Sequence, residues 1–193
     1  MRTLLLLTVL ALPLQAQAPL DRKEVDRRVA AHQADFDYLL GEWQFSSVSQ
    51  QWGPGGGVWT AVKLEGGQVL DEYRVLGDSG QTWYVTHTLR AYNAVKDQWD
   101  MMGLEYGAGL ASSGSARRVG NEVHIEQQFV NPSGPTGILR ITYYDITPDS
   151  FRWKADRSID GGKTWVTKWL TIEATRTGPP RAFAPLASAR KPS

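Results

Sequence analysis

The sequence predicts an all-β protein, an antiparallel up-and-down barrel of about ten strands with one short N-terminal helix. From Trp43 onward, apolar and polar residues alternate with a period of two, as they do in half-buried strands. Turn signals rich in glycine separate these strands, and no helical pattern lies between them. About ten strands joined by short turns exceed what a flat sheet holds well, and closure removes the exposed edges. A two-sheet sandwich is the alternative, because alternation by itself does not prove closure.

The composition limits the classes of partner and chemistry. The 193 residues include 21 basic and 20 acidic ones, for a net charge of +1. This balance predicts neither nucleic acid nor an anionic membrane surface as a partner. The chain has no cysteine, which excludes disulfides, thiolate catalysis and cysteine-ligated metals.

Residues 1–18 have the layout of a secretory signal peptide. Arg2 precedes an apolar run from Leu4 to Leu14, and small residues at Ala16 and Ala18 follow. The cut is expected after residue 18 or, alternatively, after residue 16. A buried N-terminal helix is the other interpretation. The run is too short for a transmembrane helix, and without cysteine no lipoprotein anchor can form. We therefore expect an exported protein, periplasmic or secreted, with no membrane anchor.

The remaining chain divides into a helical segment, a barrel and a tail. Asp21 and Glu24 form a capping box that predicts a helix over about 22–34, within a segment spanning 19–35. The barrel domain is expected over 36–176. Residues 177–193 are rich in proline, alanine and basic residues without periodicity, which predicts a disordered tail.

Ten strands are expected within the barrel domain, joined by glycine-containing turns that include one at residues 53–57. Their ranges are 43–50, 58–65, 68–76, 81–92, 98–106, 113–118, 122–130, 138–146, 151–159 and 164–175.

A Gly-x-Trp motif opens the first strand, and it predicts how one end of the barrel is closed. Gly41 allows a tight entry into the barrel, and the Trp43 indole is expected to close its base under a basic side chain, Arg176. The order Phe36-Asp37-x-Leu39-x-Gly41-x-Trp43, then Leu89-Arg90-Ala91-Tyr92, then Trp99, then Asp160-Gly161-Gly162-Lys163-Thr164-Trp165 resembles a bacterial calycin-like (lipocalin-like) barrel family catalogued only as a domain of unknown function. The resemblance covers about 36–176. It implies a closed antiparallel barrel with a lumen, and it implies no reaction.

Residues 158–165 also match the Asp-box, Ser-x-Asp-x-Gly-x-Thr-Trp, of sialidase-type propellers. Asp160 is expected to tie the turn to backbone N–H groups, Gly162 to take a positive φ, and Trp165 to pack beneath the hairpin. A propeller would repeat the box at blade spacing, and here it occurs once. The motif therefore predicts a stable hairpin.

The residues that face the lumen are predicted from the more apolar side of each strand. This rule places Trp83 and His87 inside on one strand, and Trp153 and Arg157 inside on another. On residues 68–76 either Glu72 or Tyr73 faces the lumen, because their side chains point to opposite faces. The expected ligand-binding set is Trp83, His87, Trp153, Arg157, Glu72, Arg140 and Trp169.

A metal or cofactor site is not expected. Zinc sites use three or more protein ligands, whereas His124 is predicted to point outward and His32 to lie on the helix. Haem-binding barrels of the nitrobindin type are similar in outline, but their iron ligand lies near the C-terminus, where this chain has no histidine.

The leading functional prediction is an exported, non-enzymatic barrel that binds a small, partly apolar molecule in its lumen. One alternative is an enzyme with His87 as base and Arg157 as anion anchor. It requires both side chains inside the barrel. Another is a scaffold whose helix or 53–57 loop contacts a protein partner.

Overall fold

The computed structural model describes residues 20–131 and 134–182, so the expected signal peptide lies outside the described residues. A helix and a 3-10 turn precede the strands. The elements are α1 (Arg22–His32), η1 (Asp37–Leu39), β1 (Gly41–Ser49), β2 (Gly53–Lys63), β3 (Val69–Leu76), β4 (Thr82–Asn93), β5 (Gln98–Glu105), β6 (Gly109–Val119), β7 (Glu122–Phe129), β8 (Gly137–Tyr144), β9 (Ser150–Ser158), β10 (Val166–Gly178) and β11 (Arg181–Ala182).

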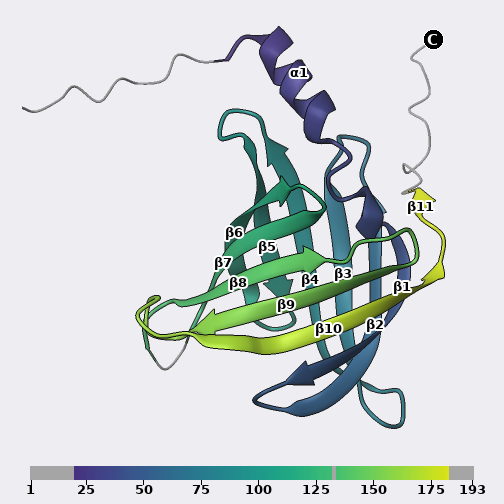
Figure 1. Cartoon of the computed structure of the whole chain (residues 1–193), viewed down its shortest axis with the longest axis vertical. Helices are drawn as coiled ribbons and strands as arrows, with labels where there is room; N and C mark the ends of the chain where they lie inside the picture. The colour runs from purple at the N-terminus through teal and green to yellow at the C-terminus, as the bar shows by residue number, and fades with distance from the viewer. Residues whose placement is uncertain (1–19, 132–133, 183–193) are drawn as a thin grey trace, which may run out of the picture.

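Strands β1 to β10 form a closed barrel (Figure 1). Each strand pairs antiparallel with its neighbours in the sequence, and β10 returns to pair with β1. This closure confirms the predicted all-β antiparallel barrel, with one N-terminal helix, over the sandwich. All ten expected strands are present, with ends shifted by a few residues.

The glycine-rich segment at residues 53–57 is part of a strand, contrary to the expected turn. It forms the first half of β2 and pairs with the second half of β1, from Phe45 opposite Gly57 to Ser49 opposite Gly53. The reversal occurs instead at residues 50–52. A side chain at Gly57 would overlap the carbonyl oxygen of Arg74, so glycine here allows β2 and β3 to approach closely. Residues 53–57 are therefore not a loop available to a partner.

The C-terminal strands also continue beyond the expected end of the barrel at residue 176. Strand β10 runs to Gly178, and β11 pairs in parallel with Val62 and Lys63 of β2, just beyond the point where β1 begins. An ion pair joins Arg181 of β11 to Glu42 of β1. Residues 177–182 are thus ordered by strand pairing, and the rest of the expected tail, 183–193, lies outside the described residues.

Helix α1 begins as predicted at the Asp21 cap, whose carboxylate accepts a hydrogen bond from Glu24 N at 2.8 Å. Hydrogen bonds from Arg27 and Arg28 lower the pKa of the Glu24 carboxyl to about 2. The helix has no fully buried residue and lies at one end of the barrel, near the β4–β5 turn (Figure 1). Its apolar stripe is therefore not its main attachment.

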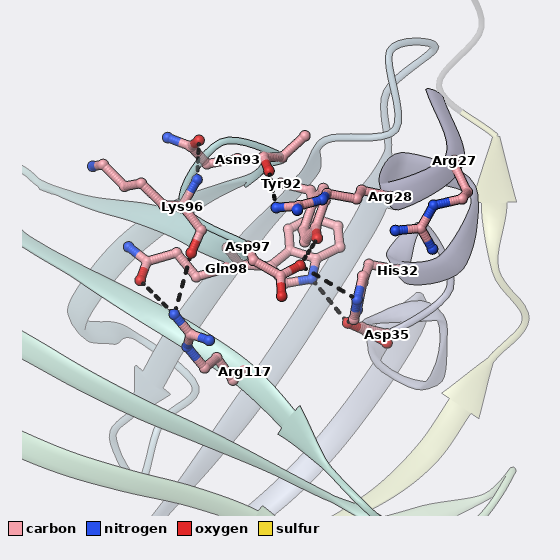
Figure 2. A network of polar contacts seen from close by, with 12 residues as sticks. Arg27, Arg28, His32, Asp35, Tyr92, Asn93, Lys96, Asp97, Gln98 and Arg117 are labelled. Carbon is pink, nitrogen blue, oxygen red and sulfur yellow. Dashed lines mark hydrogen bonds and ion pairs between the residues drawn. The ribbon is translucent and has the colours of Figure 1, made fainter. Parts of the chain in front are cut away.

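Polar and aromatic contacts hold the C-terminal end of α1 (Figure 2). The His32 ring stacks on Tyr92 with centroids 4.8 Å apart, and its Nδ1 lies 2.9 Å from an Asp35 oxygen. The Tyr92 hydroxyl donates to Asp97 at 2.6 Å, and Arg28 donates to the carbonyl of Ala94 at 3.0 Å. These contacts join the helix to the β4–β5 turn.

Candidate functional site

The two ends of the barrel differ in how deeply the inward-facing side chains are buried. At the end next to α1 the inward residues Trp43, Trp59, Val69 and Trp99 are all buried. At the opposite end most inward side chains remain partly exposed. They include Ser47, Val75, Tyr84, Thr86, Thr88, Glu105, Ser112, Gln127, Phe129, Leu139, Arg157 and Leu170. The interior is therefore packed at one end (the closed end), whereas inward side chains at the other end (the open end) reach solvent; we call this open half of the barrel the cup.

Gly41, Trp43 and Arg176 close the base as the sequence predicts. Arg176 lies over the Trp43 ring at 4.1 Å from its centroid and donates to the carbonyls of Leu40 and Tyr38 at 2.5 and 3.0 Å. Burial lowers the pKa of Arg176. Gly41 has φ of +113°, and a Cβ there would lie 2.6 Å from an Arg176 nitrogen, so no larger residue fits this entry. These residues maintain the fold.

The Asp-box hairpin also has its predicted geometry. Asp160 accepts hydrogen bonds from the backbone nitrogens of Lys163 and Thr164, both at 3.0 Å, and from the Thr164 and Ser158 hydroxyls. These bonds, the Thr164 hydroxyl first among them, hold the pKa of Asp160 well below its usual range. Gly162 has φ of +89°.

Trp165 completes the hairpin. Its indole donates to the Gly162 carbonyl at 3.0 Å, and the Arg140 guanidinium stacks on it at 4.1 Å. The hairpin is a structural device that supports the open end.

An ion pair that sequence reasoning missed lies in the interior, near the closed end. Asp71 of β3 and Arg90 of β4 are both about 2% exposed and contact each other directly. Burial by itself would lower the pKa of Arg90, but the Asp71 carboxylate outweighs it and the pKa is raised. Arg90 also stacks on Phe36, 5.1 Å from the ring centroid. The sequence carried one signal for this pair, since Asp71 and Arg90 have opposite charges and lie on neighbouring predicted strands, 68–76 and 81–92.

Four buried polar atoms near this pair have no protein hydrogen-bond partner among the described residues. They are Asp71 Oδ1, Arg90 Nε, Tyr38 OH and Trp59 Nε1. Aromatic contacts link Tyr38 and Trp59 through Tyr143 and Phe151, with centroids 5.5 to 6.0 Å apart. Buried polar atoms generally require a hydrogen-bond partner. The interior near the closed end is therefore suited to an ordered water molecule or to a polar group of a ligand.

Arg157 projects inward from β9 at the open end, as predicted. Its guanidinium lies between the rings of Phe129 and Trp169, at 5.4 and 4.9 Å from their centroids, and one nitrogen is 3.4 Å from Gln51 Oε1. No carboxylate forms an ion pair with it in the described part of the chain. The inner wall therefore carries a cation that could accept an anionic group.

The predicted inward face of β4 is wrong. Strand pairing with β3 places Tyr84, Thr86, Thr88 and Arg90 inside, so Trp83 and His87 lie on the outer wall. Trp83 is 67% exposed. The inner face of β4 is the more polar one for two reasons. Threonines line it in the open half of the barrel, and at the closed end its Arg90 is neutralised by Asp71.

Glu72 is likewise outside, and Tyr73 is the inward residue of that pair of alternatives. His87 Nε2 lies 3.0 Å from Glu72, whose other oxygen is 3.0 Å from Arg74. These three form a surface ion cluster. His87 therefore does not share the lumen with Arg157, and the enzyme that uses both is excluded.

The other expected lumen residues have mixed positions. Trp153 is inward and buried among the core aromatics. Arg140 is on the outer wall, 3.4 Å from Glu126. Trp169 lies at the mouth, packed on Trp52 at 5.3 Å. A bulge between Val166 and Leu170, with Lys168 at φ of +50°, breaks the alternation of β10, and this is why sequence periodicity did not assign its faces.

Two shallow hollows lie on the outer wall. One of about 570 Å³ has His124, Glu126 and Lys154 in its lining, so His124 points outward as predicted. The other, about 370 Å³, lies along β9 and β10. Among residues 20–131 and 134–182, no group of three histidine, aspartate or glutamate side chains is arranged to hold a metal ion. None of the described helices has the length and apolar character needed to span a membrane.

Comparisons with known proteins found solved structures with low similarity to this chain. An S-type phycobiliprotein lyase, CPES, from Guillardia theta is 10% identical, with a TM-score of 0.49 over 83% of this chain and 98% of that one. A redesigned β-barrel is 10% identical, with a TM-score of 0.39 over 73% of this chain and 93% of that one. The protein EF1p2_mFAP2b bound to DFHBI is 16% identical, with a TM-score of 0.35 over 75% and 98%. No family model and no curated protein matches the chain.

Proposed function

We propose that this protein is a calycin-like carrier that binds a small, partly apolar molecule carrying an anionic group in the open half of its barrel, without catalysing a reaction. The observation that carries the proposal is the cup: the inward side chains are sealed at one end and partly exposed at the other. Binding sites for small molecules are typically concave and largely apolar, with a few polar groups that orient the ligand.

The lining supports this ligand class. Val75, Phe129, Leu139 and Leu170 supply apolar surface at the open end, and Tyr73 and Tyr84 add aromatic rings whose centroids are 6.5 Å apart. Thr86, Thr88 and Ser112 supply hydroxyl groups. A ligand with an apolar body would therefore find both contact surface and hydrogen-bond partners.

Arg157 supports the anionic group. Its charge faces the interior, and the two flanking rings hold the guanidinium in place without neutralising it. A carboxylate or phosphate placed there would form a charge-assisted hydrogen bond, which is stronger than a neutral one.

The proposal is tested with a dansyl-labelled fatty acid as the probe and Arg157→Gln as the variant. We expect binding to weaken about tenfold or more, because a hydrogen bond to a charged group contributes about 1.5–3 kcal/mol. Arg152→Gln is the matched control, since it removes an arginine from the outer face of the same strand. Native mass spectrometry of the protein purified from its own host would identify the natural ligand. Equal probe affinity in all three proteins, together with no co-purifying molecule, would refute the proposal.

We also propose that the protein is exported, on the strength of the charged and apolar pattern of residues 1–18. Fusion of these residues to a reporter that is active only outside the cytoplasm tests this. Intact mass should show a mature chain beginning after residue 18 or residue 16. A full-length chain retained in the cytoplasm would refute it.

A further inference from the structure

Large apolar side chains are exposed around the mouth of the barrel. They belong to separate turns and strand ends of the open end: Trp52 (69% exposed), Trp83 (67%), Tyr106 (95%), Leu110 (60%), Val130 (70%) and Ile159 (51%). We call these six residues the apolar rim. In an up-and-down barrel the β1–β2, β3–β4, β5–β6, β7–β8 and β9–β10 connections all lie at the same end. The six residues therefore encircle the opening.

The closed end of the barrel has the opposite character. Among the described residues, its exposed large apolar side chains are Val95 and Val119. Its turns carry Glu65, Lys96, Asp97, Asp145 and Asp149, and the charged helix α1 lies beside them (Figure 1). Folding alone does not require this asymmetry, because exposed apolar residues on a soluble surface are normally scattered.

The five open-end turns carry little charge, although Arg157 and the exposed Lys168 lie on the strands beside the β9–β10 turn. The described residues of the five open-end turns include three charged ones, Asp78, Asp160 and Lys163. The Asp160 carboxylate is already engaged by hydrogen bonds within its own hairpin. Such a surface has no cluster of positive charge to attract an anionic surface, and little charge to desolvate at a neutral one.

From this ring we infer that the open end docks on a neutral lipid surface, with the apolar rim inserted among zwitterionic headgroups. Trp and Tyr are the side chains that favour this interface, because their rings are apolar and their N–H or O–H groups remain hydrated. Lipid conforms to a ring of separate turns around an opening, whereas a protein partner would need a complementary shape. The inference does not depend on a lumen ligand, although docking would place the mouth of the cup against the bilayer.

Flotation of the mature chain with phosphatidylcholine vesicles tests the inference. We expect the wild-type protein to float, and Trp83→Ser/Tyr106→Ser to partition at least about tenfold less, because two interfacial anchors are removed. Val95→Ser/Val119→Ser, which removes exposed apolar side chains from the closed end, is the matched control and should float like the wild type. Circular dichroism confirms that each variant is folded.

Three results would overturn the inference. One is a wild-type protein that stays with the soluble fraction on phosphatidylcholine vesicles, or binds only when phosphatidylglycerol is added. Another is a rim variant that floats as well as the wild type. The third is a wild-type protein that does not float and that light scattering shows to be a dimer. If Trp83→Ser/Tyr106→Ser converts this dimer to a monomer, the rim binds a second copy of the chain.

Discussion

The Asp71 carboxylate and the Arg90 guanidinium form a direct ion pair inside the barrel, on adjacent strands and almost completely shielded from solvent. Asp71→Asn should lower the free energy of unfolding by about 3–5 kcal/mol, because it leaves the buried guanidinium without its counter-charge. Arg90→Met should cost a similar amount. Urea unfolding followed by tryptophan fluorescence measures both.

The matching double variant, Asp71→Leu/Arg90→Met, separates the pair from general packing. It should cost clearly less than the sum of the two single changes, because neither charge is then buried alone. Additive losses would contradict the ion pair as the source of the effect.

Gly41→Ala should destabilise the protein by more than about 2 kcal/mol, because a Cβ at φ of +113° is strained and also meets Arg176 at 2.6 Å. Gly80→Ala is the matched control. Gly80 has φ of +82°, and a Cβ added there would meet no other part of the chain within 4 Å, so only the backbone strain of about 1 kcal/mol should appear. Equal midpoints of thermal unfolding for the two variants would argue against the close approach at the barrel base.

The stabilisation by Asp160 should depend on pH in a defined direction. The pKa of this carboxyl is lowered in the folded protein. Its contribution to the free energy of unfolding is therefore complete above the pKa of the unfolded chain, about 4, and is lost as pH falls toward the pKa of the folded protein. The difference in urea midpoint between wild type and Asp160→Ala should therefore be largest at neutral pH and shrink below about pH 4.

Lys163→Gln is the control for Asp160, because it removes a charge from the same hairpin and retains the hydrogen bonds to Asp160. If the difference in urea midpoint between wild type and Asp160→Ala stayed constant down to strongly acidic pH, it would contradict a stabilising role for the Asp160 carboxylate.

Adjacent residues on β4 provide a test of the inner wall. Thr86 faces the interior at the open end, whereas Val85 faces outward. Thr86→Phe should abolish binding of the dansyl-labelled fatty acid by filling the cup, and Val85→Phe should leave it within about twofold, because affinity responds to the volume of the binding site. Fluorescence titration measures both affinities. Unchanged binding in Thr86→Phe would place the ligand elsewhere.

His87→Ala should change the free energy of unfolding by no more than about 1 kcal/mol, because its contact with Glu72 is a partly exposed pair on the outer wall. Probe affinity should be unchanged, as should that of the paired control Lys154→Ala. A large loss of probe binding in His87→Ala would contradict the outward placement.

The motif at residues 158–165 correctly predicted local geometry, because its contacts lie within one hairpin. Asp160 accepts hydrogen bonds from backbone nitrogens of its own turn, whereas Gly41 and Trp43 also depend on Arg176 at the other end of the barrel domain. Periodicity and turn signals likewise predicted the ten strands and one N-terminal helix, since both depend on neighbouring residues.

Tertiary structure decided which faces of β4 and β10 point into the barrel. Hydrophobicity alone favoured Trp83 and His87 as inward residues, but closure fixes the register of β4 against β3, and this register turns Arg90 toward Asp71. A single bulge at Lys168 shifts the faces of β10 and leaves Trp169 at the mouth. The ion pair joins residues of two different strands, and the bulge exchanges the inward and outward faces on either side of it, so neither effect follows from the alternation within a single strand. The sequence by itself therefore predicted the barrel, the residues of its base and the inward face of β9, whereas the closed sheet decided which faces of β4 and β10 line the cup.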